Sequence, residues 1–228
     1  MSSGPTSSAP PSSAPSPRTR LIREASRAVY DRIAIYEILD EGFICHIGFM
    51  HDGQPFVIPT SYGRSGDKLY VHGSSVSRML KQMHAGVQVC ITVTLLDGLV
   101  LARSIFNHSM NYRSVVVLGK ATLVDDPEEK LEALRRLSEH IIPGRWVDSR
   151  LPNEKELRQT SILSVPIEEF SAKVRQGPAV DDEEDYGFPT WAGVLPLDLV
   201  PGEPLPDDRL EPDRKVPPYL VNYSRGRR

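Results

Sequence analysis

Short β-branched segments separated by turn residues occupy most of the chain between residues 43 and 124. Gly- and Asp-containing turn signals interrupt them, most clearly at His51-Asp52-Gly53-Gln54, Arg64-Ser65-Gly66-Asp67 and Asp97-Gly98. We predict strands over residues 43–50, 55–62, 68–72, 87–95, 99–106, 113–124 and 161–174. Because strands joined by short turns pair antiparallel, the expected fold is mostly β, an antiparallel barrel of six or seven strands with peripheral helices.

Three other segments have the apolar spacing of helices. Residues 21–39 place apolar side chains near a helical repeat, and Gly42 ends the pattern. A short helix is expected to begin at Gly73-Ser74-Ser75. Its apolar residues follow the helical spacing i, i+3, i+4 and i+7, at Val76, Met79, Leu80 and Met83. The third begins at Asp126, a capping residue followed by Pro127 at the first helical position, and ends before Pro143.

The prolines divide the chain into a core and two ends. Five of the 20 prolines lie within residues 1–17, nine lie within 178–228, and six lie between. We therefore expect a disordered Ser/Pro-rich tail over 1–19, one folded domain over 20–177 and a proline-rich extension over 178–228. The apolar stretch 187–196 contains Trp191, whose large indole would be left exposed to water if the stretch were free in solution. This part of the extension is therefore expected to dock on its own domain or on a partner subunit.

Composition and missing motifs exclude several classes of protein. No apolar run approaches the roughly 18–20 residues that span a bilayer, so we expect no membrane insertion. The net charge of −3 argues against a general nucleic-acid-binding protein. The first 16 residues lack the apolar core of a secretory signal, and two cysteines are too few for a disulfide framework, which predicts a cytoplasmic protein. The spacing of the six histidines predicts no metal site.

The segment Tyr70–Ser77 delivers His72, Gly73 and Ser74 to the start of the expected short helix. Free backbone N–H groups at a helix start can bind an anion, and Arg78 adds a guanidinium suited to phosphate oxygens. An ordinary serine cap beside a surface arginine explains the same residues, and from these residues alone it is the simpler interpretation. A second polar stretch, 107–114, precedes a buried strand, and a hairpin end accounts for its Asn and Ser but not for Tyr112 and Arg113.

Taken together, these pieces resemble the FMN-binding split-barrel superfamily, in particular its pyridoxamine 5′-phosphate oxidase-related flavoproteins of the nitroimidazole-resistance type. The resemblance covers about residues 20–196 in family order. It is carried by Gly53-Gln54-Pro55, Ile58–Tyr62, Gly66–Ser74, Asp97–Val100, His108–Val116 with Gly119, Pro143–Trp146, Ser171–Arg175 and Trp191–Val194.

The resemblance implies a homodimer that holds FMN in the cleft between its subunits. Its cofactor-binding residues would be Ile58, Pro59, Thr60, Ser61, Val71, His72, Gly73, Ser74, Arg78, Asn111, Arg113, Ser114 and Trp191. The segment 58–61 would lie along the flavin ring, the segment 72–78 would bind the phosphate and ribityl chain, and Trp191 would cover the ring, donated by either subunit. A histidine at the position of His72 has a reactive role in the nitroimidazole-resistance proteins, so His72 is also the candidate catalytic residue.

Two departures from the family narrow the implied activity. The oxidases proper carry an Arg-Lys pair for phosphate where this chain has Arg78-Met79, and their C-terminal Arg-Leu-His-Asp-type substrate motif is absent after Trp191. Vitamin B6 oxidation is therefore not expected. The implied function is an FMN-dependent oxidoreductase acting on a small planar substrate, with NAD(P)H as a plausible donor. The alternatives are a non-catalytic flavin-binding module and a split-barrel protein that uses haem or F420.

Overall fold

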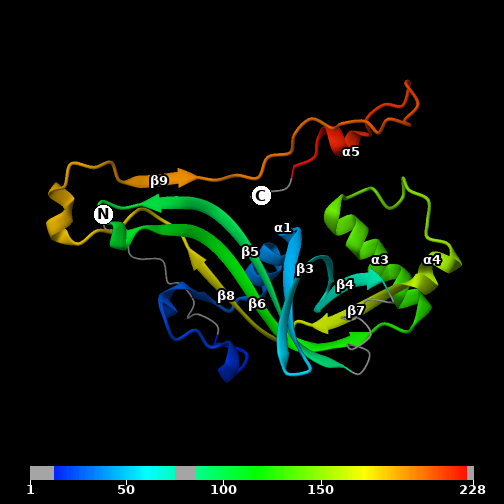
Figure 1. The fold of residues 1–228 in the computed structure, drawn as a ribbon, viewed down its shortest axis with the longest axis horizontal. Helices are drawn as coiled ribbons and strands as arrows, with labels where there is room; N and C mark the ends of the chain where they lie inside the picture. The colour runs from blue at the N-terminus through cyan, green and yellow to red at the C-terminus, as the bar shows by residue number, and fades with distance from the viewer. Residues whose placement is uncertain (1–12, 75–85, 225–228) are drawn as a thin grey trace, which may run out of the picture.

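The computed structural model describes residues 13–74 and 86–224, which fold into an antiparallel β structure with few helices (Figure 1). Its strands are β1 (Ala28–Val29), β2 (Ile44–His51), β3 (Gln54–Ser65), β4 (Lys68–Ser74), β5 (Val87–Leu101), β6 (Ser109–Leu123), β7 (Thr160–Pro166), β8 (Glu169–Arg175) and β9 (Gly193–Pro196). Its α-helices are α1 (Arg32–Glu41), α3 (Pro127–Ile141), α4 (Glu154–Gln159) and α5 (Pro218–Val221), and short 3-10 turns are η1 (Pro17–Thr19), η2 (Ala25–Arg27), η3 (Ile105–Asn107) and η4 (Glu183–Gly187).

Six of these strands pair in a ring. The order of the sheet is β1-β8-β6-β7-β4-β3-β2-β5-β9, and an additional pairing of β5 with β6 brings the ring back to its start. Two strands each have two partners on one edge. β6 pairs with β8 through residues 112–118 and then with β7 at Thr122 and Leu123, and β5 pairs with β2 through residues 89–92 and then with β9 through residues 98–101. The mostly β, antiparallel, split-barrel-like architecture predicted from the sequence is therefore confirmed.

The core fills the interior of this ring. β2 shows the expected alternation, because Cys45, Ile47 and Phe49 are buried while Ile44, His46 and Met50 point outward. Helix α1 adds Ile35, Ile38 and Leu39 to the core, and its Asp31 cap accepts a hydrogen bond from the N–H of Ala34. A smaller cluster that includes Ala133 and Leu137 packs under α3, whose predicted Asp126 cap and Pro127 start are confirmed.

The predicted helix over 21–39 is wrong in its first half. Glu24 adopts a left-handed backbone with φ of 56°, and residues 28–29 form β1, which pairs with Lys173 and Ala172 of β8. The helix begins only after the Asp31 cap. Ile22, which belongs to the apolar spacing, is 89% exposed, so the spacing does not correspond to a buried face.

Two predicted strand boundaries are also wrong. Asp97-Gly98 is not a turn: β5 runs continuously from 87 to 101 with a bulge there, and the chain reverses at 102–108 instead. The predicted strand 161–174 is two strands, β7 and β8, because Pro166 ends β7 and the N–H of Ile167 turns away to donate to the carbonyl of Asp67. With β1 and β9, these changes give nine strands in the described residues instead of six or seven. The predicted helix over 73–83 falls largely on residues 75–85, outside the described part.

The segments just before β1 and just after β8 both contact the sheet or its connecting loops. In the segment before β1, Ser16 and Arg18 donate hydrogen bonds to the carboxylate of Glu169 in β8. After β8, the buried Asp181 accepts from the backbone N–H groups of Arg103 and Ser104 at 2.8 and 3.1 Å. β9 then pairs with residues 98–101 of β5, so residues 193–196 of the predicted docking stretch lie against their own chain.

The close approach of α3 to β3 predicts a strict requirement for glycine at position 63. A Cβ at Gly63 would lie 2.9 Å from backbone atoms of Arg136 and Leu137, which cannot move without shifting the helix. We expect Gly63→Ala to destabilise the protein by about 1–3 kcal/mol in urea unfolding. The matched control is Gly202→Ala, where a Cβ meets nothing within 4 Å, and its effect should stay within about 0.5 kcal/mol. Equal stability of the two variants would contradict this packing.

Candidate functional site

β3 changes its partner along its length. Residues 54–61 pair with β2, from Gln54 opposite His51 to Ser61 opposite Ile44. On the other edge, β3 pairs with β4 only over Tyr62–Ser65, ending at Tyr62 opposite Val71. β4 continues beyond that point paired with β7, through Ser74 opposite Thr160. β3 and β4 therefore separate at the Tyr62–Val71 pair, and β4 follows β7 toward α3 (Figure 1).

Two strand segments face this separation, and together we call them the junction: residues 58–61 of β3 and 72–74 of β4. Each segment is hydrogen-bonded on its outer side, to β2 and to β7 respectively. Within the described residues, no strand pairs with the edges that face each other across the opening. Backbone N–H and C=O groups are obligatory hydrogen-bonding groups, so an unpaired pair of edges is suited to a ligand with donors and acceptors along its rim.

The side chains at the junction alternate between core and surface. Val71 is fully buried, so only its backbone could contact a ligand, and Ile58 is half-buried and packs against the core. Pro59 and His72 are exposed, and Ser61 is half-buried. Thr60 is also half-buried and donates its hydroxyl to the carbonyl of Ser61 at 3.2 Å. The structure places eight predicted site residues on the strands that border one opening, and their contact with a cofactor stays a prediction: Ile58, Pro59, Thr60, Ser61, Val71, His72, Gly73 and Ser74.

His72 is the titratable group of the junction. Its ring is accessible to solvent, yet the protein packed around it lowers the pKa of the imidazole by burial. A neutral imidazole carries one free lone pair, which can accept a proton or bind a metal. Arg78, predicted to hold a phosphate, lies outside the described residues.

Arg113 forms the strongest charged cluster of the described structure. Its guanidinium is bidentate to the carboxylate of Glu41 at the end of α1 and bidentate to Asp97 at 2.8 and 2.9 Å. These two carboxylates raise the pKa of Arg113. Glu41 lies three residues before Ile44, which pairs with Ser61 of the junction. Arg113 thus fixes the start of β2 beside the junction while its own donors are already engaged by carboxylates.

Asn111 and Ser114 tie β6 to β8 and to the segment that follows it. Asn111 is buried, donates to the carbonyl of Gly177 at 3.1 Å and accepts a hydrogen bond from Arg175. Ser114 donates to the carbonyl of Lys173 at 3.3 Å. Both predicted site residues therefore make hydrogen bonds inside the chain, on the side of the ring where β6 meets β8.

Trp191 does not meet the junction within one chain. It is 67% exposed and precedes β9, whose Gly193 pairs with Leu101 of β5. β5 pairs with β2 over residues 89–92, and Thr92, opposite His46, is the end of this pairing nearer to β9. Nine residues of strand separate Thr92 from Leu101, a distance of about 30 Å at 3.3 Å per residue. The indole of Trp191 therefore lies far from the junction of its own chain.

Sequence reasoning missed three residues near the site. Asp97 was interpreted as part of a turn, although a carboxylate inside an apolar run also signals a buried ion pair. Glu41 gave no signal, because its partner lies 72 residues away. His46 points outward from β2, opposite Pro59, and the alternation of 44–50 placed it on the surface without suggesting a role.

The described residues contain no group of three or more His, Cys, Asp or Glu residues placed to hold a metal ion. None of the helices among them is long and apolar enough to cross a membrane.

The chain is similar to proteins of one family over most of its length. The pyridoxamine 5′-phosphate oxidase family matches residues 31–174. The flavocytochrome Anf3 from Azotobacter vinelandii is 45% identical, with a TM-score of 0.87 over 93% of this chain and 99% of that one. An FAD- and haem-binding protein from Mycobacterium smegmatis is 32% identical, with a TM-score of 0.82 over 86% and 96%.

A more distant likeness is to a solved structure from Bacteroides thetaiotaomicron. A candidate 5-nitroimidazole antibiotic resistance protein from Bacteroides thetaiotaomicron is 27% identical, with a TM-score of 0.54 over 64% of this chain and 86% of that one. No curated protein matches the chain.

The Arg113 cluster predicts a large cost for removing its cation. In Arg113→Met, Asp97 and Glu41 keep side chains that are only 7% and 22% exposed but lose the guanidinium between them. We expect a loss of about 3 kcal/mol in the free energy of unfolding, measured by urea denaturation. Lys68→Met removes the cation of a more exposed pair with Glu129 and should cost at most about 1 kcal/mol. Similar losses in both variants would show that the cluster contributes no more than a surface pair.

Proposed function

The chain belongs to the pyridoxamine 5′-phosphate oxidase family, and from this membership and the geometry of the junction we propose that it is a redox protein that binds a flavin together with a haem. The observation that supports flavin binding most directly is the unpaired pair of strand edges at residues 58–61 and 72–74. The proposal replaces the expectation of flavin alone, because two relatives above 30% identity are named for both groups.

The residues at the junction fit a flavin. The pyrimidine side of the flavin ring presents alternating hydrogen-bond donors and acceptors, which match backbone groups on an unpaired strand edge. Residues 58–61 would bind that side of the ring. Gly73 and Ser74, with Arg78, would bind the phosphate. When bound, the flavin supplies the electron chemistry, while the chain binds it, orients it and excludes water.

The nature of the flavin is part of the proposal. The resemblance seen in the sequence implies FMN, whereas the relative from Mycobacterium smegmatis is named for FAD. The phosphate contacts at Gly73 and Ser74 suit either molecule, because both carry a phosphate on the ribityl chain. We keep FMN as the prediction, with FAD as the competing result.

The described histidines offer ligands for a haem. His51 pairs with Asp52, His108 contacts the carbonyl of Ala102, and His140 contacts the carbonyl of Gly42. Within the described part of the chain, His46 and His72 have exposed rings with no such contact. We propose His72 as the iron ligand because it borders the junction, where electron exchange with the flavin would be direct.

The active form is proposed to be a homodimer with the flavin between its subunits. Trp191 lies about 30 Å along the sheet from the strand pair beside the junction, so only a second copy could place this indole over the flavin. Arg113 would act as a positioning residue, because Glu41 and Asp97 engage its donors, and Asn111 and Ser114 would hold β6 in the same way. NAD(P)H as donor, a small planar substrate and a cytoplasmic location remain predictions. The competing function is a non-catalytic flavin-binding module, which would carry flavin without turnover.

The absorbance spectrum of the purified protein tests the proposal. We expect flavin bands together with a Soret band, and about one flavin per chain after release and chromatography, which also separates FMN from FAD. A colourless protein that takes up no added flavin would overturn the flavin proposal. Flavin without a Soret band, even after supplying haem, would overturn the haem proposal alone. Bleaching of the flavin by NADH or NADPH separates a redox enzyme from a passive module.

The ligand assignment predicts a specific effect of His72→Ala. Loss of an iron ligand should shift the Soret band and change the electron paramagnetic resonance signal of the ferric haem, and added imidazole should restore both. His51→Ala is the matched control, since that ring already pairs with Asp52. A His72→Ala protein with the spectrum of the parent would disprove the assignment, and a change in His46→Ala instead would transfer it to His46.

A further inference from the structure

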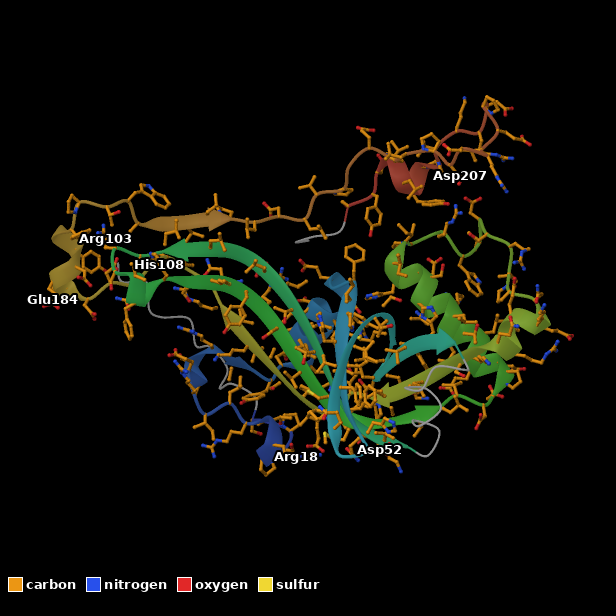
Figure 2. All side chains as sticks on the ribbon, in the orientation of Figure 1. Arg18, Asp52, Arg103, His108, Glu184 and Asp207 are labelled. Atoms are coloured by element: carbon orange, nitrogen blue, oxygen red, sulfur yellow. The ribbon has the colours of Figure 1, made fainter. Side chains whose placement is uncertain are left out.

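The segment 198–216, which we call the arm, runs along the molecule and approaches its own body at residues 199–201, near Phe43 and Tyr223. Every residue of the arm is exposed. Its two ends are nonetheless fixed: the N–H of Leu197 donates to the carbonyl of Asp97 at 3.2 Å, and beyond the arm Tyr219 and Tyr223 contact the end of α3. The Tyr219 hydroxyl bonds Asp148 and Arg145, and the Tyr223 hydroxyl donates to the carbonyl of Ile141 at 2.9 Å. Figure 2 shows the arm along one edge of the molecule, where Asp207 is labelled.

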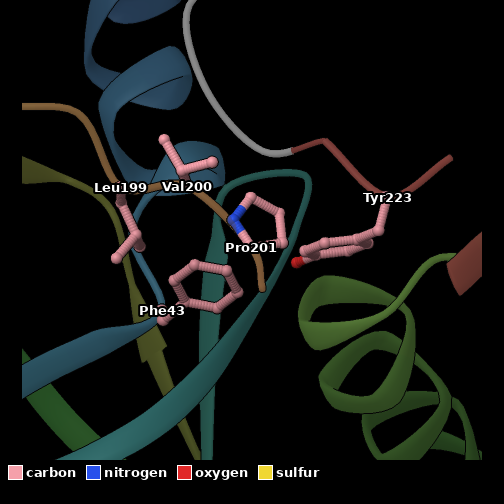
Figure 3. A pocket seen from close by; sticks show the side chains of 5 residues that line it. All are labelled: Phe43, Leu199, Val200, Pro201 and Tyr223. Carbon is pink, nitrogen blue, oxygen red and sulfur yellow. The ribbon is translucent and has the colours of Figure 1, made fainter. Parts of the chain in front are cut away.

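The arm presents apolar side chains that its own chain does not cover. Leu199, Val200 and Leu205 are 74%, 76% and 90% exposed. The described hydrogen bonds within the arm are local, from Arg209 and Leu210 to Asp207 and from Arg214 to Glu211. Where the arm comes nearest to the body it leaves an apolar cavity of about 210 Å³, lined by Phe43, Leu199, Val200, Pro201 and Tyr223 (Figure 3). Such a segment needs an external surface to offset the entropy of holding it in place.

The same chain carries surfaces that complement the arm in polarity and charge. Met50 and Val57 are 56% and 67% exposed and share the outward face of β2 and β3, because Val57 pairs with Gly48. The arm contains six acidic and three basic residues, a net charge of −3. Residues 18–27 contain four arginines and one glutamate, a net charge of +3. Figure 2 places Arg18 and Asp52, which mark these two surfaces, at the edge opposite Asp207.

These surfaces cannot meet within one molecule. Both ends of the arm are fixed on the side of β9 and α3, and the complementary surfaces lie across the body. In a twofold dimer, each copy can supply an arm and receive one, so that both exposed surfaces are covered in one closed arrangement. Arg18 and Arg27 already pair with Glu169 and Glu24, so Arg20 and Arg23 are the main source of positive charge for the arm.

We propose that the arm is a clasp that packs on a second copy of this chain. This inference rests on the homodimer proposed above, and it assigns the hold on the partner to residues 198–216, beyond the segment 31–174 that the family shares. The apolar side chains Leu199, Val200 and Leu205 would supply the main contacts, with the charges adding a salt-sensitive attraction.

The test compares two triple variants of the full chain with bound cofactors. In the arm variant, Ser replaces each of Leu199, Val200 and Leu205. In the control variant, Ser replaces three residues outside the arm that are 84%, 87% and 51% exposed, namely Ile105, Val147 and Leu151. Sedimentation velocity over a dilution series gives the dimer dissociation constant. We expect the arm variant to dissociate at least tenfold more readily than the parent, the control to match the parent, and all three to unfold at similar temperatures.

The outcomes separate this inference from the proposals it rests on. A parent protein that sediments as a monomer would remove both the dimer and the clasp. A dimeric parent whose arm variant dimerises equally well would overturn the clasp alone, even if that variant loses flavin or haem. A dissociation constant for the parent that does not rise with salt would remove the proposed charge attraction between the arm and residues 18–27, while the triple variant still tests the apolar contact.

Discussion

The arrangement of this protein depends on the hydrogen-bonding demand of one long strand. The backbone of β3 forms its hydrogen bonds with β2 over residues 54–61 and with β4 over residues 62–65, and the change of partner occurs at Tyr62. Tyr62 is itself completely buried, and its hydroxyl donates to the carbonyl of Leu39 in α1. The point where two sheets separate is therefore held rigidly by the core. An opening created in this way keeps its shape without a ligand, which is the condition for preorganised binding.

Local chemistry decided which parts of the fold could be predicted. The turns at Gly53 and Gly66 were found because their left-handed backbone requires glycine, and Asp126-Pro127 marked a helix start through capping that involves only neighbours. Asp97-Gly98 has the same composition as a turn, yet it lies inside β5 because Asp97 pairs with Arg113. The start of α1 was missed because β1 depends on β8, more than 140 residues later in the chain. Interactions between distant segments overrode the local pattern in both places.

The candidate site was predictable to a similar extent. Residues 58–61 and 72–74 were named from the family resemblance, and the strand pairing brings them to one opening. Arg113, Asn111 and Ser114 carry the polar side chains expected of a binding site, but each is engaged by a partner that no local pattern reveals. Trp191 lies far along the sheet from the junction of its own chain. One chain cannot show whether a second copy would bring this side chain close. A sequence shows which polar side chains are present, but it does not show which of them are left free to bind a ligand in the folded chain.

The position of β9 changes what counts as the minimal folding unit. The family match ends at residue 174, but β1 and β9 lie outside 31–174 and pair with the edges of β8 and β5. A fragment cut to the family boundaries would expose both edges, including the stretch around Val100, which is fully buried in the whole chain. Uncovered apolar strand edges invite other chains to add to them. β1 and β9 therefore protect the protein from aggregation by covering these edges, and the solubility of any shortened form will depend on keeping both strands.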